Sequence, residues 1–484
     1  MKAKILIIWM LSYLLGAIVA PFFEADPTTW LLYGLVIGLC SFFLFKFKFL
    51  WAAFFGIGLV LVSISQFQYQ TLHFNLINHE YAGKTSNYLG TISEMPIKIE
   101  HGNKVIIEIK TINGEAQNDK AILYMKEYPV VKFSEIIKFD GKLKSYGDSK
   151  NRLIKDRIIG EMSVDEFSIT GKNKSLYYQI KGVLYSLRSA FNEALKEVLP
   201  QEESGLASGL ILGEKTLISP EFTRALQNSG TSHIIALSGY NITIILSLFV
   251  AFRIHLSRRL NLLLPICFII LFIIMTGASA SIVRAGIMGM MPVLAKYLGR
   301  NNNSFIAILF SATVMVLFNP FIVLYDVGFQ LSFAALCGMI YLGPIISKWF
   351  TKLPEIINFT LSETLGAQVA TLPLLLYYFG RASIISPISN LVILSLVPLG
   401  MLISFVIGVC YMTLPILGQL VAIPGYFILH LFYVLINFFG DLPYASTQIK
   451  IESPFWLFVS YLIILDIIYL GHKRSKRIKT QINL

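Results

Sequence analysis

The sequence predicts a polytopic α-helical membrane protein with one small β domain inserted between its helices. The chain is 55% hydrophobic, has a mean hydropathy of +0.67, and only 14% of its 484 residues are charged. Soluble domains are about 45–50% apolar and about 25% charged. The apolar residues form long blocks rather than the periodic pattern of a soluble core. One segment, 71–175, interrupts these blocks with the composition of a soluble domain.

Three apolar blocks open the chain, at roughly 4–20, 29–45 and 49–67. A helix of about 20 apolar residues crosses the hydrocarbon core of a bilayer. Lys2 and Lys4 precede the first block. Lys46 and Lys48 separate the second block from the third, so the positive-inside bias places the amino terminus in the cytoplasm. Residues 1–70 are therefore predicted as three transmembrane helices, after which the chain is outside.

The segment 71–175 is predicted to be an extracytoplasmic β domain. Apolar and polar residues alternate in NKVIIEIKTING (103–114) and again in EIIKFDGKLKS (135–145), which is the period of a half-buried strand. Asn113-Gly114 is typical of a tight hairpin turn. These patterns predict a small antiparallel sheet or barrel.

The segment 176–200 is predicted to be an amphipathic helix, because its apolar residues recur at steps of three and four. The apolar face of such a helix can lie on the outer surface of the membrane or pack against the β domain. The sequence leaves both positions open.

Nine further apolar blocks bring the predicted number of membrane helices to about twelve. They lie at roughly 233–252, 262–276, 281–298, 304–318, 328–346, 360–378, 387–411, 415–439 and 454–471. The helical domain is thus predicted over 201–471, followed by a basic tail at 472–484. Threading the blocks from outside places four of five basic clusters, the tail included, in the cytoplasm; Arg381 is the exception. Both termini are therefore expected in the cytoplasm.

Several charged and strongly polar side chains fall inside or at the ends of these predicted spans. Such groups are costly in hydrocarbon, and they usually face a wet cavity or a partner. Arg284 can pair with Asp326 or Glu363 to hold helices together, or it can line a polar path, and both roles are compatible. The other polar residues of this kind are Gln330, Gln368 and Asn390.

Glycines are dense just ahead of the first block of the helical domain, at Gly205, Gly209 and Gly213. Small residues at four-residue spacing are typical of closely packed helices. The alternative is a short or broken helix that dips into the bilayer, which is tolerated only where it borders protein or water.

The chain resembles the ComEC competence family in several motifs that occur in family order. Residues 204–245 read SGLASGLILGEKTLISPEFTRALQNSGTSHIIALSGYNITII, which is similar to the family's glycine-rich half helix, charged loop and Gly-Thr-Ser-His and Ser-Gly segment. Four later blocks also look like those of the family: GASASIVRAGIMGMMP (277–292), YDVGFQLSFAALCG (325–338), QVATLPLLLYYFG (368–380) and SPISNLVILSLVPL (386–399).

This resemblance implies a channel that passes single-stranded DNA across the cytoplasmic (inner) membrane during natural transformation, with an OB-like barrel as its external domain. Single-stranded DNA and the lipid bilayer would be its partners, alongside a separate DNA receptor, nuclease and cytoplasmic motor, and assembly into a homo-oligomer stays open. Gly239 joins the glycines named above. The residues expected to line the path are His233, Ser238, Asn241, Arg284, Asp326, Gln330, Glu363, Gln368 and Asn390.

One departure from the family concerns catalysis. Many members carry a carboxy-terminal metallo-β-lactamase-like domain with His-rich metal motifs, but this sequence contains no H-x-H-x-D-H motif, and its seven histidines are scattered. The four cysteines show no paired spacing. We therefore expect no metal site, no cofactor and no catalytic residue, and a nuclease would have to be another protein.

Two other functions compete with the channel. A secondary transporter of a small solute also has a helical bundle with broken helices and buried charges, although no clear internal repeat is present. An intramembrane hydrolase could use Ser238 with His233 as its base. The segment lacks the G-x-S-x-G elbow and has no acidic residue beside it, which makes the hydrolase the weaker of the two.

Overall fold

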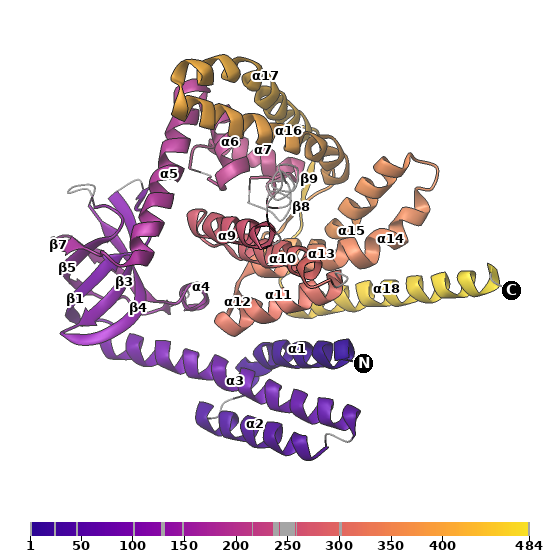
Figure 1. The fold of residues 1–484 in the computed structure, drawn as a ribbon, viewed down its shortest axis with the longest axis horizontal. Helices are drawn as coiled ribbons and strands as arrows, with labels where there is room; N and C mark the ends of the chain where they lie inside the picture. The colour runs from indigo at the N-terminus through magenta and orange to yellow at the C-terminus, as the bar shows by residue number, and fades with distance from the viewer. Residues whose placement is uncertain are drawn as a thin grey trace. The chain divides into compact units, whose positions relative to one another are not determined.

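The computed structural model divides into two compact units. Unit 1 contains Met1–Ser186, Ile266–Ala278 and Met290–Asp326, and unit 2 contains Leu187–Pro265, Ser279–Gly289 and Val327–Leu484. Figure 1 labels their helices and strands. The structure describes residues 2–23, 26–44, 47–99, 102–126, 131–147, 150–214, 216–235, 242, 257, 259–299 and 303–482.

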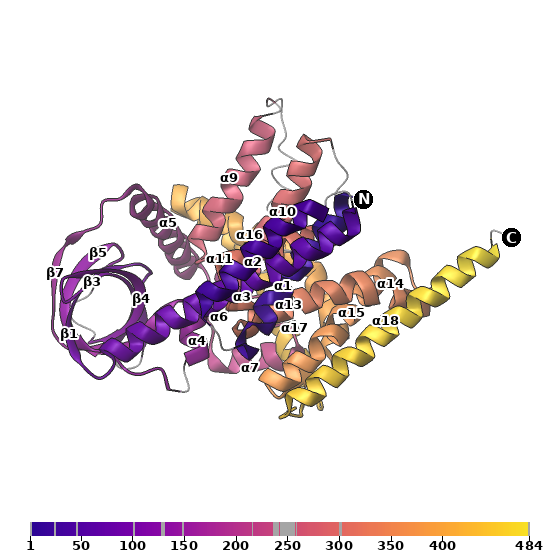
Figure 2. The same ribbon diagram turned by 90° about the horizontal axis from the view of Figure 1, so that it is seen from below.

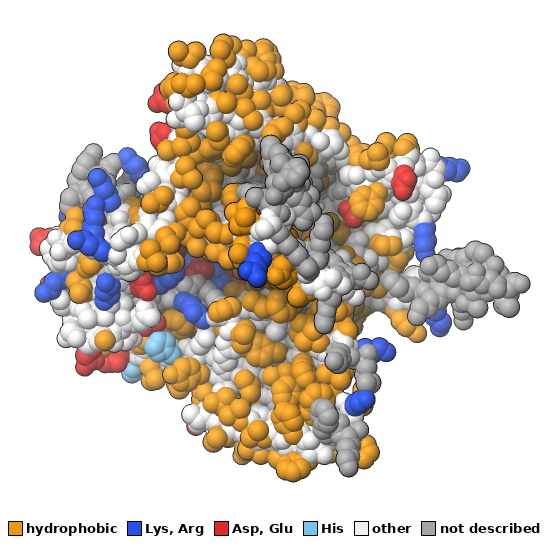
Figure 3. All heavy atoms as spheres, in the orientation of Figure 1, with side chains coloured by type: hydrophobic (Ala, Val, Ile, Leu, Met, Phe, Trp, Pro, Cys, Tyr) orange, Lys and Arg blue, Asp and Glu red, His pale blue; other side chains and the backbone are white. Residues whose placement is uncertain are grey.

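Seven helical segments of the described chain are long and apolar enough to cross a membrane, which confirms the polytopic class. In Figure 3, hydrophobic side chains cover the surface of the helices, while charged ones gather over the strands. The seven are α1 (Lys2–Val19) with η1 (Ala20–Phe22), α2 (Pro27–Ser41) with η2 (Phe42–Leu44), α3 (Lys48–Tyr81), the segment Val327–Trp349, α16 (Ser386–Thr413), α17 (Pro415–Gly440) and α18 (Pro454–Ile482).

The predicted count of twelve is not confirmed. Three apolar helices are shorter: α9 (Leu260–Met275), α10 (Ala280–Tyr297) and α11 (Ser304–Phe318). α15 (Glu355–Tyr378) coincides with another predicted block but carries polar residues such as Glu363 and Gln368 along its length. Most of the predicted block at 233–252 lies outside the described residues.

The first three helices of unit 1 pack through glycine. A Cβ on Gly34 would lie 2.9 Å from the carbonyl oxygen of Gly58, and a Cβ on Gly58 would lie 2.8 Å from that of Gly34. Because neither residue has a side chain, the backbones of α2 and α3 approach directly. A Cβ on Gly16 would likewise clash with the backbone of α3 at Val60.

α3 continues for 34 residues to Tyr81, past position 71, where the β domain is predicted to begin. Its last four turns remain helical although their composition is polar, because Phe67, Phe74 and Ile77 are buried in the core of the β domain. One helix thus enters the hydrocarbon span at one end and the soluble core at the other.

The β domain is a single seven-stranded sheet in the order β6-β4-β3-β1-β5-β7, with β2 paired to β3. Its strands are β1 (Thr85–Ile92), β2 (Ile97–Ile99), β3 (Gly102–Ile112), β4 (Glu115–Met125), β5 (Glu135–Lys142), β6 (Ile158–Val164) and β7 (Phe167–Lys172), and α4 (Lys150–Lys155) precedes β6. All pairs are antiparallel except β4 with β6, which is parallel. The predicted antiparallel pattern therefore holds for most of the sheet.

The sheet curls strongly but does not close into a barrel among the described residues. Figure 2 views the strands nearly end-on and shows them bending round on themselves. The two outer strands in the pairing order, β6 and β7, do not pair with each other. A backbone hydrogen bond of 2.9 Å from Lys144 to Glu161 links the residues after β5 to β6. The OB-like barrel is therefore not confirmed.

The alternation predicted for two strands is confirmed. Val105, Ile107 and Ile109 of β3 are fully buried. Ile137 and Phe139 of β5 point into the same core. The β3–β4 hairpin turns at Asn113 and Gly114, whose φ angles are 51° and 89°. Positive φ at both central residues is what a type I′ turn requires, and Asn-Gly is the pair that best accepts it.

α5 (Leu176–Val198) packs its first half against the β domain. Tyr178 and Tyr185 are buried, and the Tyr178 hydroxyl donates to Glu108 of β3 at 2.5 Å. Lys181 donates to the carbonyl oxygen of Ser93 at 2.8 Å and lies 5.8 Å from the ring centroid of Phe133. Burial lowers the pKa of Lys181 and raises that of Tyr178. The predicted amphipathic helix is thus present, with its polar and aromatic face on the β domain.

Unit 2 is helical and includes a broken segment. α13 (Val327–Cys337) passes into the π-helical turn η4 (Gly338–Leu342), then into α14 (Gly343–Ile346) and η5 (Ser347–Trp349). The turn crosses α15 where Gly338 faces Gly366: a Cβ on Gly338 would clash with the carbonyl oxygen of Gly366, and a Cβ on Gly366 would lie 2.7 Å from that of Gly338. Glycine at both positions allows this contact.

Replacement of Gly338 by Ala should destabilise unit 2, because the new methyl group has no space at this crossing. We expect a lower thermal midpoint of the purified protein in detergent, by an amount equivalent to about 1–3 kcal/mol. Gly38→Ala is the matched control, since a Cβ on this helical glycine meets no atom within 4 Å. It should leave the midpoint unchanged or raise it slightly through helix propensity. Equal midpoints for the two variants would contradict the close crossing.

Candidate functional site

The glycines predicted at 205–213 allow a loop to lie directly on a short helix. α6 (Gln201–Leu212) is buried along most of its length. A Cβ on Gly205 would lie 3.1 Å from the carbonyl oxygen of Leu217, and one on Gly209 would lie 2.7 Å from Cγ2 of Ile235. Gly213 ends the helix in the left-handed conformation, with φ 69°. Twelve residues extend about 18 Å, which is too short to cross the bilayer.

The turn after α7 (Pro220–Ser229) is fixed to the beginning of α16. Gly230 has φ 75°, and a Cβ there would lie 2.6 Å from Cβ of Ser386. Ser389 donates to the carbonyl oxygen of Ser229 at 2.6 Å, and the Ser229 and Thr231 hydroxyls lie 2.7 Å apart. The Ser-Gly-Thr turn of the sequence motif is therefore buried among serines.

A small two-stranded sheet supports the same turn. β8 (Arg381–Ser383) pairs with β9 (Ser446–Gln448) in antiparallel register. The Ser446 hydroxyl donates to the side chain of Asn228 at 3.1 Å. Segments more than 200 residues apart in the sequence thus meet at the end of α7.

Two of the predicted path residues lie beside this turn. The Gln368 amide donates to the carbonyl oxygen of Ser383 at 2.9 Å, and the Asn390 amide donates to the Ser386 hydroxyl at 3.0 Å. The side-chain oxygens of Gln368 and Asn390 are buried and have no hydrogen-bond partner in the described part of the chain. Buried acceptors of this kind are rare, because each costs about 1–3 kcal/mol when it is left unpaired.

The remaining predicted residues of this motif are only partly placed. His233 lies in the turn at 231–235 that follows Gly230. Ser238, Gly239 and Asn241 lie outside the described residues, so their contacts with the turn stay predictions.

Arg284 forms the centre of a second polar group in unit 2. Its side chain is 8% exposed, although it lies in the first turns of the apolar helix α10. Nη1 donates to the carbonyl oxygen of Ser332 at 2.7 Å, and the guanidinium lies 5.7 Å from the ring centroid of Phe333. Nε is buried and has no hydrogen-bond partner among the described residues. Within the described part of the chain, this cation is therefore held by a carbonyl group and a ring, and no carboxylate pairs with it.

The carboxylates offered as partners for Arg284 lie elsewhere. Among the described residues Arg284 forms no ion pair with Glu363, which is half-buried on α15. Asp326 belongs to unit 1 and pairs with Lys155 at 3.3 Å. The Gln330 side chain hydrogen bonds with Tyr378 of α15. The sequence patterns predict that these residues lie in or at the ends of membrane spans, but they do not predict which side chains they contact.

Two pairs of ionisable side chains in unit 2 were not predicted. Glu203, in the first turn of α6, is 5% exposed and lies 2.8 Å from Nδ1 of His430 on α17. Arg188 of α5 donates to Glu214 at 2.7 Å. Burial alone would raise the pKa of Glu214, but Arg188 and hydrogen bonds from Thr216 outweigh it and lower the pKa. The sequence contained one signal for the first pair: His430 lies within the long apolar block at 415–439, where a polar side chain usually has a partner.

The described residues contain no group of three or more His, Cys, Asp or Glu side chains arranged to hold a metal ion. The polar groups of unit 2 are instead amides, hydroxyls, a guanidinium and the isolated pairs described above. Such groups recognise a ligand by hydrogen bonds and charge.

These features define a polytopic membrane protein whose helical unit buries polar side chains in an apolar surrounding. The chain belongs to the Competence protein family, whose model matches residues 210–474. It is also similar to the ComE operon protein 3 of Bacillus subtilis (strain 168), with 28% identity over 315 residues. The match covers 64% of this chain and 40% of that protein. No solved structure matches the chain. The predicted resemblance to the ComEC competence family is confirmed.

Replacement of Gly230 by Ala should disrupt the buried turn, because the residue has a positive φ and its Cβ would meet Ser386. Gly299→Ala is the matched control: Gly299 has φ 63°, but a Cβ there meets no atom within 4 Å. Both variants incur about 1–2 kcal/mol for the left-handed backbone, and only Gly230→Ala adds a clash. We expect the thermal midpoint in detergent to fall more for Gly230→Ala. Equal losses would show that the contact with Ser386 is unimportant.

Proposed function

We propose that this protein conducts single-stranded DNA across the cytoplasmic membrane during natural transformation. The main support for this proposal is that the match to the Competence protein family, at residues 210–474, includes the buried polar groups around Gly230 and Arg284. The same match begins within α6 and continues into α18. A role in competence DNA uptake follows from family membership, and the channel is our proposal.

The chemistry of the polar groups supports a strand of DNA as the substrate. A single strand carries one phosphate charge per nucleotide and exposes bases, so a route for it needs cationic and amide groups together with aromatic faces. Arg284 offers a buried cation next to the Phe333 ring, with Nε unpaired in the described residues. Gln368 and Asn390 offer buried amide oxygens that can accept from the bases. A charged side chain in a span is costly and is kept mainly where it has a function.

The orientation of the chain in the membrane is also part of this proposal. We place both termini in the cytoplasm and the β domain outside, because Lys2, Lys4 and the basic tail flank the predicted spans. The proposed helix count remains about twelve, with α15 and the segment at 233–252 added to the apolar helices. The curled sheet would act as an OB-like structural collar. Because the match covers 40% of the Bacillus subtilis protein, a separate DNA receptor, nuclease and motor also remain proposals.

The substitution Arg284→Ala should reduce DNA uptake by about 10- to 100-fold, which corresponds to the roughly 1.5–3 kcal/mol of a hydrogen bond to a charged group. Arg284→Lys should restore part of the activity if positive charge is the main requirement. Transformation frequency, corrected for the amount of protein in the membrane, is the measurement. Arg224→Ala is the control, since Arg224 is exposed on α7. Normal uptake with Arg284→Ala would remove this residue from the path.

Deletion of the gene should abolish cytoplasmic donor DNA while leaving DNA at the cell surface. Labelled donor DNA in the two locations is scored separately in deletion and complemented strains. This pattern would place the protein at the inner-membrane crossing. Unchanged cytoplasmic DNA would instead favour a secondary transporter of a small solute, for which broken helices such as α13 to η5 are also typical.

A further inference from the structure

The residue that precedes α13 is tied to the β domain by an ion pair. Asp326 lies between α12 (Ile322–Tyr325) and α13, and its carboxylate is 3.3 Å from the ammonium group of Lys155 at the end of α4. The side chains of Lys155 and Asp326 are only 24% and 17% exposed. Salt and water screen a partly buried pair less than a surface pair. Asp326, predicted to line the path, is therefore a contact of the β domain.

The rest of the segment 318–326 is fastened to the same domain. The Asn319 amide donates to the carbonyl oxygen of Lys155 at 2.8 Å, and Arg157 donates to the carbonyl oxygen of Phe318. Phe321 is fully buried in the core of the β domain, with its ring centroid 4.9 Å from that of Phe67. The ion pair is thus the last of several contacts that hold this segment, and it is the one next to α13.

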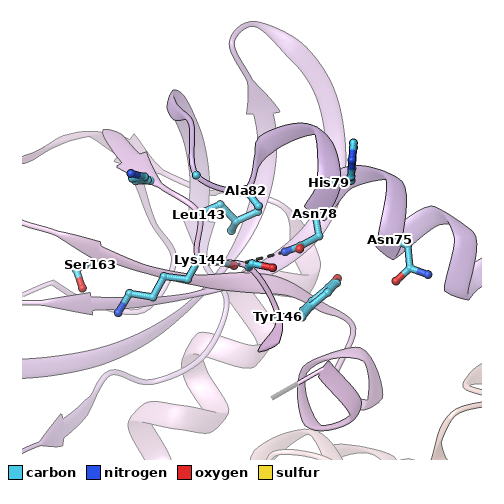
Figure 4. A pocket seen from close by; sticks show the side chains of 11 residues that line it. Asn75, Asn78, His79, Ala82, Leu143, Lys144, Tyr146 and Ser163 are labelled. Atoms are coloured by element: carbon cyan, nitrogen blue, oxygen red, sulfur yellow. Dashed lines mark hydrogen bonds between the residues drawn. The ribbon is translucent and has the colours of Figure 1, made fainter. Parts of the chain in front are cut away.

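The segments on both sides of α4 are themselves bonded to α3. Before α4, the buried Tyr146 hydroxyl donates to the carbonyl oxygen of Phe74 at 3.2 Å. After α4, the carbonyl oxygen of Ile159 accepts from the Asn78 amide at 3.0 Å. Figure 4 shows Asn78 pointing from α3 toward Lys144, whose carbonyl oxygen it also reaches, at 3.5 Å. Lys155 is therefore carried by a part of the β domain that is fixed to a membrane helix.

α13 carries the contacts of the buried Arg284. The carbonyl oxygen of Ser332 accepts from Nη1 at 2.7 Å, and the guanidinium lies 5.7 Å from the ring centroid of Phe333. Ser332 comes six residues after Asp326, which is about 9 Å along a helix. A shift in the residue at which α13 begins would therefore move the groups that hold Arg284.

We propose that Lys155 and Asp326 are positioning residues for the path. Their ion pair holds the start of α13 to the β domain, and α13 in turn holds the carbonyl oxygen of Ser332 at Arg284. The inference rests on the proposed function. It gives the β domain a mechanical role in uptake that requires no contact between this domain and the substrate.

The test uses variants of the full chain that remove one charge each. Lys155→Met keeps an unbranched side chain without the ammonium group. Asp326→Asn removes the carboxylate but keeps a residue that is favoured just before a helix. Lys126→Met is the matched control: Lys126 and Asp165 of the same domain are 3.0 Å apart, but they are 70% and 75% exposed, and such surface pairs contribute little.

The first measurement is transformation frequency, corrected for the amount of protein in the membrane. Lys155→Met and Asp326→Asn should each lower it by about tenfold, within the range of about 5- to 150-fold that is typical of coupled sites. The double variant should be no worse than either single variant, because both remove the same interaction. Lys155→Arg, which keeps the positive charge, should retain uptake, as should Lys126→Met. Losses that multiply in the double variant would show that the two residues act independently and would overturn the proposal.

The second measurement is hydrogen–deuterium exchange of the α13 amides, 327–337, on the purified protein in nanodiscs. Exchange should become faster in Lys155→Met and in Asp326→Asn, and it should be unchanged in Lys126→Met. Reduced uptake with unchanged exchange in α13 would mean that the pair only stabilises the β domain, and the positioning role would be wrong. Asp326→Asn keeps the test decisive if Lys155→Met is poorly produced.

Failure of the proposed function gives a different result. In that case the deletion strain keeps cytoplasmic donor DNA. The exchange measurement involves no DNA, so the link between the Lys155–Asp326 pair and α13 is judged separately.

Discussion

The fold depends on one constraint: a polar group inside hydrocarbon must find its partner within the protein. Hydroxyl groups in the helices meet it locally. Ser404 donates to the carbonyl oxygen of Gly400 at 2.7 Å, and Thr371 donates to that of Ala367 at 2.9 Å. Arg284 meets it between helices, through the carbonyl oxygen of Ser332. Several buried side-chain atoms have no partner among the described residues, and three of them, on Gln368, Asn390 and Nε of Arg284, belong to the path that we propose.

The β domain is coupled to its helices by the same kind of contact. α3 brings Phe67 and Phe74 into a core that also contains Phe321, from the segment after α11. Lys155, at the end of α4, pairs with Asp326, and the Asn319 amide donates to the carbonyl oxygen of Lys155 at 2.8 Å. Burial raises the pKa of the neighbouring Asp156. Unit 1 is therefore one structure that combines a soluble sheet with membrane helices.

Close backbone contacts at glycine recur in the helices of both units. In unit 1, α3 contributes to the core of the β domain at one end and packs against α2 through Gly34 and Gly58 at the other. In unit 2, the turn at Gly230 is held by Ser389 and Ser386 of α16. In both units, glycine allows close backbone contact, and short hydrogen bonds then hold the polar residues in place.

The sequence by itself determined the local features of this protein. Hydropathy predicted most of the helices, because a membrane span needs only about 20 consecutive apolar residues in one segment of the sequence. Period-two alternation predicted β3 and β5, and Asn113-Gly114 predicted the turn that joins β3 to β4. Both could be predicted because the faces of a strand and the angles of a turn depend on neighbouring residues. Only the tertiary structure decided the partners. Lys155 with Asp326, Glu203 with His430, the parallel β4–β6 pair and the length of α3 all depend on residues distant in sequence. Such pairings follow from packing in three dimensions, which no local pattern of residues contains.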